Sequence, residues 1–228
     1  MTTEQNKQIT LSRYIEDFLE EHFGEIPENI SVILKPPFLL IYLEEFLLPG
    51  EKLFVERQYW NRVLENRDFI MKSLKPDLMA GLQEQAGRNV LDLYTDWNLE
   101  RRSGLIMAVF EAETAPEELP WPEEVDQEAI REIVQLNSIR TQKKPDNQYF
   151  YWLTPDVLLI ERVGVMVDIE KQLIQNGVKE ELRLAKRPME QRIVKLFNLE
   201  TLLKAQVKEL FVDWNFEKDK SFMVLMLQ

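Results

Sequence analysis

The residues that most suggest a binding site occur twice in this chain. Asp96-Trp97-Asn98 returns as Asp213-Trp214-Asn215, each time between an apolar run and a charged turn. Asp96 and Asp213 could together bind a cation or a partner. Alternatively, each Asp accepts hydrogen bonds from turn amides, each Trp packs inward, and each Asn tolerates the backbone angles of a turn. We favour the structural role and keep binding as the alternative.

A second aromatic group could form a ligand box or a contact surface. The run contains Tyr149, Tyr151 and Trp152 in consecutive strand-like sequence with Phe150. Successive side chains of a strand point to opposite faces of its sheet, so the four rings cannot line one pocket. A place in the core and in an interface between the two halves is the preferred interpretation.

The remaining reactive residues do not form a recognisable catalytic or metal-binding pattern. The chain has one histidine, His22, and no cysteine, whereas a zinc site needs several such ligands. No glycine-rich phosphate loop occurs, and Glu44 and Glu45 are adjacent on a predicted strand, which points them apart. We therefore predict no catalytic, cofactor-binding or metal-binding residue. A metal-dependent hydrolase using scattered carboxylates is the weakest alternative.

Composition restricts the classes of partner. The 228 residues carry a net charge of −12, which opposes binding to nucleic acid or anionic lipid. The absence of cysteine and of a signal peptide favours a cytoplasmic protein. The longest apolar runs are far shorter than the roughly 20 residues of a spanning helix, so no direct membrane insertion is expected.

Hydrophobic periodicity predicts the same order of elements in both halves. The first half has an amphipathic helix over 9–23 that begins near Thr10 or Ser12, and strands at 30–34 and 38–43. A long helix follows from 53 to Gly87, with either a kink or a break at Pro76, and then strands at 90–97 and 105–110. The second half has a helix over 122–139, strands at 149–153 and 157–163, a long helix over 168–203, and strands at 207–214 and 222–227.

The predicted fold is therefore α+β, with two tandem α-β-β-α-β-β repeats. Residues 1–112 form the first repeat, the acidic and proline-rich segment 113–124 is a linker, and residues 125–228 form the second, divergent repeat. Each repeat should have a small antiparallel sheet covered by two helices. The strands are apolar at consecutive positions, which predicts that the repeats pack together as a pseudo-dimer.

The first half, from about Gly24 to Glu111, resembles the MpsC-like family, the accessory component of a Na+-translocating, membrane-potential-generating system. The similar residues are Leu47-Leu48-Pro49-Gly50-Glu51-Lys52-Leu53 at a helix start, then Val63, Arg67, Leu74, Pro76 and Leu78, and finally Gly87, Val90 and Asp96. The second half keeps Glu170-Lys171, Leu173, Gly177, Val178 and Asp213 but has no counterpart of Gly87 in its sequence.

The resemblance implies a non-enzymatic cytoplasmic accessory domain. We expect a protein-interaction or regulatory module that serves membrane ion- or inorganic-carbon-transport machinery, with a protein partner and no cofactor. Homo-oligomerisation is left open. The alternative is a small-ligand sensor with a pocket between the two repeats, enclosed by Trp97, Trp214 or the aromatics at Tyr149 to Trp152.

Overall fold

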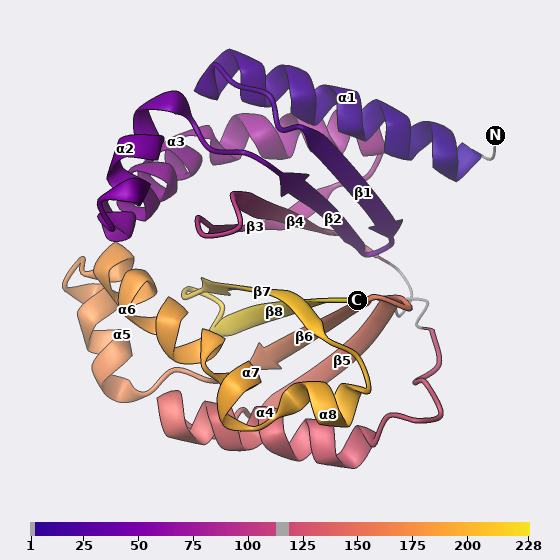
Figure 1. Cartoon of the computed structure of the whole chain (residues 1–228), viewed down its shortest axis with the longest axis vertical. Coiled ribbons are helices and arrows are strands. Elements are labelled where there is room, and N and C mark those ends of the chain that lie inside the picture. Colours follow the sequence, from indigo (N-terminus) through magenta and orange to yellow (C-terminus); the bar gives the residue numbers. More distant parts are fainter. Residues whose placement is uncertain (1–2, 113–118) are drawn as a thin grey trace. The chain divides into compact units, whose positions relative to one another are not determined.

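The computed structural model describes residues 3–112 and 119–228, which form two compact units of the same design. The units are Met1–Glu117 and Glu118–Gln228, and each is described by itself. In both units the helices lie on one face of a four-stranded antiparallel sheet (Figure 1). The predicted α+β fold in two similar halves is confirmed.

The first unit has three helices and four strands. In chain order they are α1 (Thr3–Phe23), β1 (Asn29–Lys35), β2 (Phe38–Glu44), α2 (Pro49–Glu56), α3 (Trp60–Ala86), β3 (Val90–Asn98) and β4 (Ser103–Phe110). The strand order in the sheet is β1-β2-β4-β3, so β1 and β3 are its edges. Pro36 and Pro37 lie in the β1–β2 connection, as predicted, because neither can donate to a strand ladder.

The second unit repeats this order with a more broken helical layer. Its elements are α4 (Gln127–Thr141), β5 (Asn147–Thr154), β6 (Val157–Val163), α5 (Asp168–Gln175), α6 (Lys179–Gln191), α7 (Ile193–Leu196), α8 (Leu199–Leu203), β7 (Val207–Asn215) and β8 (Lys220–Leu227). The strand order is β5-β6-β8-β7, the counterpart of the first sheet.

Strand alternation divides each sheet into two apolar faces. Leu39, Ile41 and Leu43 of β2 belong to the core under the helices, together with Trp97 of β3. Phe38, Leu40 and Tyr42 alternate with them and therefore lie on the opposite face. A sheet with two apolar faces explains the consecutive apolar residues of the sequence. The pseudo-dimer stays a prediction.

Several predicted helix boundaries were wrong. Helix α1 begins at Thr3, ahead of Thr10 and Ser12. The long helix of the first half is two helices, and α3 continues through Pro76 without a break. The helix predicted to start at 122 begins at Gln127, because Asp126 caps it by accepting a hydrogen bond from Ala129 N at 3.0 Å.

The long helix predicted over 168–203 is instead four helices, α5 to α8. Asn198 adopts the left-handed conformation at the start of α8 (φ 49°), which interrupts the helical path. At the end of α8, Lys204 is also left-handed (φ 56°), where Gly87 ends α3 with φ 65°. The second half therefore does have a structural counterpart of Gly87, and it was missed because the residue is a lysine.

The segment predicted as a linker is only partly described. Residues 113–118 lie outside the described residues, whereas 119–124 are described. Leu119 N donates to Trp152 O at 3.1 Å, which joins this segment to β5. The Trp121 ring lies 5.8 Å from the Phe150 ring and 6.0 Å from the Trp152 ring. The end of the segment thus packs against the second unit.

A fully buried ionic network distinguishes the second unit. The Arg162 guanidinium donates from Nη2 to Glu190 Oε1 at 3.0 Å and from Nη1 to Oε2 at 3.1 Å. Ser138 Oγ, Asn137 Nδ2 and Ser221 Oγ complete the hydrogen bonds around the pair. The matching positions of the first unit hold Leu43 and Met71, both buried and apolar.

Replacing Arg162 alone should therefore lower the free energy of unfolding more than replacing Arg162 and Glu190 together. Arg162→Leu leaves a buried carboxylate without its cation and should lower the free energy of unfolding by about 3–5 kcal/mol. Arg162→Leu with Glu190→Met places the residue types of the first unit at these two positions and should recover part of that loss, since Asn137 and Ser221 still lose their bonds to the pair. Urea unfolding of the two variants measures both effects, and a double variant less stable than the single one would contradict the expectation.

Candidate functional site

The two Asp-Trp-Asn triplets lie at equivalent strand ends, and each Trp covers a buried ion pair. Trp97 and Trp214 end β3 and β7 and are almost completely buried. In the first unit the Trp97 ring lies under the guanidinium of Arg67, whose Cζ is 4.5 Å from the ring centroid. In the second unit the Lys186 ammonium is 5.2 Å from the Trp214 ring.

A glutamate completes each arrangement. Arg67 Nε donates to Glu51 Oε1 at 2.8 Å and Arg67 Nη2 donates to Glu51 Oε2 at 2.5 Å, which is a two-point ion pair. Lys186 Nζ donates to Glu170 Oε1 at 2.8 Å. We call Glu51, Arg67 and Trp97 the first clamp, and Glu170, Lys186 and Trp214 the second clamp.

The first clamp joins four elements of the unit. Glu51 lies in the first turn of α2 and accepts from Leu48 N at 3.0 Å, so it also caps the start of that helix. Arg67 extends from α3 and donates to the Phe46 carbonyl, just after β2, at 3.0 Å. The charges of the pair thus hold α2 and α3 against the ends of β2 and β3.

The second clamp has the same arrangement, with Lys186 as the donor in place of an arginine. Glu170 accepts from Val167 N at 3.2 Å, which reproduces the helix cap of Glu51. A lysine has a single charged nitrogen where arginine has a planar fork, so the two-point pair is lost. Burial lowers the pKa of the Lys186 ammonium, and the Glu170 carboxylate partly opposes that shift.

Each aspartate of the triplets accepts a hydrogen bond from the backbone N–H of the residue that follows it. Asp96 Oδ1 accepts from Trp97 N at 2.9 Å, and Asp213 Oδ1 accepts from Trp214 N at 2.7 Å. The asparagines accept hydrogen bonds from amides of the turns. Asn98 Oδ1 accepts from Arg101 N, and Asn215 Oδ1 accepts from Glu217 N and Lys218 N, each at 3.1 Å.

The asparagines are not the left-handed residues of their turns. The left-handed residues of the two turns are Arg102 and Asp219, with φ of 54° and 48°. The two aspartates also differ in their surroundings. Arg183 Nη1 lies 2.9 Å from Asp213 Oδ1, whereas the position of the first unit that matches Arg183 is Leu64.

The aromatic run of β5 divides between the two sheet faces as predicted. Phe150 and Trp152 belong to the core under the helices. Tyr149 and Tyr151 alternate with them, and their rings stack at 6.5 Å with an interplanar angle of 19°. Trp152 is buried and packs on Trp121.

The sequence analysis did not identify the four charged residues of the clamps as site residues. The signal was present, because Glu51 and Arg67 are 16 positions apart, as are Glu170 and Lys186. Charged residues on a helix are usually solvated, and nothing in a single sequence says that these four are buried.

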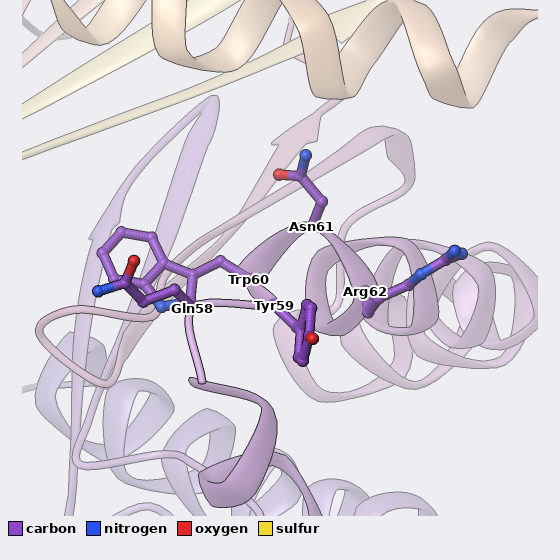
Figure 2. A pocket seen from close by; sticks show the side chains of 5 residues that line it. All are labelled: Gln58, Tyr59, Trp60, Asn61 and Arg62. Carbon is purple, nitrogen blue, oxygen red and sulfur yellow. The ribbon is translucent and has the colours of Figure 1, made fainter. Parts of the chain in front are cut away.

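A third feature lies on the surface at the corner between α2 and α3. Gln58, Tyr59, Trp60, Asn61 and Arg62 line a depression of about 540 Å³. Figure 2 shows their side chains fanning out from the loop and the first turn of α3. With Leu53 and Phe54 of α2, which are also exposed, we call these residues the α2–α3 corner.

The corner has local hydrogen bonds although it is exposed. Trp60 Nε1 donates to Val55 O at 3.0 Å, and Tyr59 N donates to Phe54 O at 2.8 Å. Gln58 is left-handed (φ 62°) where the second unit has Gly177 (φ 83°). A non-glycine residue in that conformation is a cost that other local contacts must offset, and such residues concentrate at functional sites.

The described residues contain neither a metal-binding cluster nor a membrane-spanning helix. Within 3–112 and 119–228, no group of three or more histidine, aspartate or glutamate side chains converges to hold a metal ion. None of the helices in these ranges combines the length and apolar character needed to cross a bilayer.

Comparison with known proteins places the first unit in a family. Residues 3–112 match the family model described as the Na+-translocating membrane potential-generating system (MpsC). The match covers the first repeat and confirms the resemblance read from its sequence. The comparison with curated proteins and the comparison with solved structures found no match.

The first clamp predicts a large penalty for removing its carboxylate. Glu51→Gln should lower the free energy of unfolding by about 3–5 kcal/mol, because the buried Arg67 loses its counter-charge. The matched control is Glu65→Gln, which breaks an exposed pair with Arg62 and should change stability by about 0.5 kcal/mol or less. If thermal and urea unfolding show the same loss of stability for Glu51→Gln and Glu65→Gln, the buried pair contributes no more than an exposed one.

Gly104 provides a second test, because it faces Trp97 across the β3–β4 ladder. A Cβ at this position would collide with the indole ring, so Gly104→Ala should destabilise the chain by about 1–3 kcal/mol. Gly50→Ala is the control, since its Cβ would meet no atom. Indole fluorescence should also change in Gly104→Ala. A variant with unchanged fluorescence and stability would disprove the packing.

Proposed function

Because the first repeat, residues 3–112, belongs to the MpsC family, we propose that this chain is a non-enzymatic interaction module. It would serve membrane ion- or inorganic-carbon-transport machinery from the cytoplasm by binding a protein component of that machinery. The α2–α3 corner is the observation that supports this proposal.

The residue types of the corner are those that dominate protein interfaces. Tyr59 is 58% exposed and Trp60 is 40% exposed, and Arg57 and Arg62 are exposed on either side of them. Tyrosine, tryptophan and arginine are the residues whose truncation most often costs 2 kcal/mol or more in binding. The hydrogen bond of the Trp60 indole to Val55 O orients that side chain, which lowers the entropy lost on binding.

The charge of the corner is opposite to that of the chain. Lys52, Arg57 and Arg62 are exposed there against Glu56 and against Glu65, which pairs with Arg62 at 3.1 Å, whereas the whole chain carries −12. A locally basic, aromatic surface favours a partner with an acidic rim around an apolar pocket. The second unit has no such corner, since Lys179 and Val178 occupy the positions of Trp60 and Tyr59.

The two clamps have a structural role that is separate from binding, and both repeats share it. Their charged groups are paired with each other and buried under aromatic rings, so their evident effect is to fix helices on the sheet. In the first unit, this places the corner at the junction of the two clamped helices.

Site-specific cross-linking would test the proposal. A photo-reactive amino acid at Asn61, in cells that naturally express the chain, should cross-link to an integral membrane transport protein. Tyr59→Ala should reduce that product about thirtyfold, the effect of losing about 2 kcal/mol of binding. Ile169→Ala is the control, because Ile169 is 65% exposed on α5 of the other unit.

Two outcomes would contradict the proposal. One is a corner that cross-links to no membrane protein while the purified chain shows catalytic turnover. The other is a membrane-protein product that Tyr59→Ala and Ile169→Ala affect equally. A metabolite that raises the melting temperature of the purified chain in a saturable way would favour the small-ligand alternative instead.

A further inference from the structure

The first unit has a second surface feature, a groove beside the edge strand of its sheet. A groove of about 420 Å³ lies between α1 and β1, which contact each other. Its lining residues are Gln5, Gln8, Ile9 and Ser12 of α1 and Ile30 and Val32 of β1. Strand β1 is an edge of the sheet, with β2 on its inner side (Figure 1).

In the second unit, the chain itself occupies the corresponding place. Leu119 forms an antiparallel bridge with Trp152 on the edge strand β5. Two residues later the Trp121 ring packs against Phe150 and Trp152. With its amide oxygen turned toward these donors, Gln127 of α4 accepts from Trp121 Nε1 at 3.1 Å and from Arg131 Nη2 at 2.9 Å.

The helices that border the two places correspond residue by residue. Leu11 and Ile15 of α1 are completely buried, and so are Ile130 and Val134 of α4 at the same spacing. This alignment matches Gln8 of the groove with Gln127, the residue that binds the Trp121 indole.

The same alignment places Ser12 where the second unit has Arg131. The Arg131 guanidinium lies 5.8 Å from the Trp121 ring and 4.6 Å from the Phe150 ring. Ser12 is therefore a smaller residue at a position that contacts the inserted ring in the second unit.

The strands correspond as well. Val32 pairs with Ile41 of β2, and Phe150 pairs with Ile160 of β6, which is the counterpart of Ile41. Val32 of the groove thus occupies the position of Phe150, which contacts Trp121. The groove of the first unit is the site that Trp121 fills in the second.

We propose that this groove binds an extended segment of a partner protein, of the Leu-Pro-Trp type found at residues 119–121. The segment pairs its backbone with the outer edge of β1 and inserts a tryptophan between β1 and α1. Backbone pairing supplies general affinity in such edge additions, and the pocket for the side chain supplies specificity.

The groove residues suit this occupant. The Gln8 amide can accept the indole N–H, as Gln127 does for Trp121. Ile9 is 43% exposed and offers an apolar wall that the inserted ring would cover. The proposal does not rest on the α2–α3 corner, which lies on other elements, so either can fail alone.

A fluorescein-labelled peptide with the sequence of residues 119–123, Leu-Pro-Trp-Pro-Glu, tests the proposal directly. Fluorescence anisotropy with the full chain should show saturable binding of one peptide per chain. Replacing the peptide's tryptophan by alanine should weaken binding at least tenfold. The chain variant Ile9→Asp should weaken it by a similar factor, since it places a charge in the apolar wall.

Controls make each outcome decisive. Ile139→Asp alters a residue of α4 that is 47% exposed, outside the groove, and should leave binding unchanged. Gln8→Lys replaces the acceptor by a cation and should weaken binding if Ile9→Asp proves unstable. The proposal is wrong if the peptide does not saturate at about 1 mM, a very weak affinity, or if it binds equally with and without its tryptophan.

Discussion

The buried ion pair under a tryptophan is the interaction on which each repeat depends. Taking a carboxylate and a cation out of water costs several kcal/mol, which the pair recovers only with good geometry and further hydrogen bonds. The first clamp meets this condition through the two-point contact of Arg67 with Glu51 and the bond to the Phe46 carbonyl. The start of α2, the middle of α3 and the end of β3 must therefore stay together.

The clamp is common to both repeats, while the features that could recognise a partner are not. The second repeat keeps Glu170, Lys186 and Trp214, yet it lacks the exposed tyrosine and tryptophan of the α2–α3 corner. It also fills its own groove with Trp121. The first repeat, which is the part that matches a known family, carries both open surfaces. The first repeat thus has two exposed surfaces whose matching places in the second repeat hold Val178 and Lys179 or are filled by Trp121.

The two cores show how far a duplicated unit can diverge without losing its fold. Arg162 and Glu190 stand where the first repeat has Leu43 and Met71, and both solutions fill the space under the helices. A buried pair tolerates this exchange only if both members change and the polar groups around them are satisfied. The serines and asparagine that bind the pair are therefore part of the same change.

The sequence alone determined the repeat, the α+β class, the strand positions and the family of the first half. These follow from local period and from residue order, which a single chain displays directly. It also showed that the rings around Trp152 divide between two faces. It did not reveal the break of the second long helix into α5 to α8. The left-handed Gly177 between α5 and α6 could have indicated one break, whereas the left-handed Asn198 before α8 has no unique local signal.

Tertiary structure decided which charged residues are buried and which aromatics are exposed. Glu51 and Arg67 look like ordinary surface residues until the helices are placed on the sheet, and Tyr59 and Trp60 look like core residues until α2 ends beside them. The physical reason is that burial depends on what other segments cover a side chain. Segments that are distant in the sequence supply that cover, and no local pattern contains them.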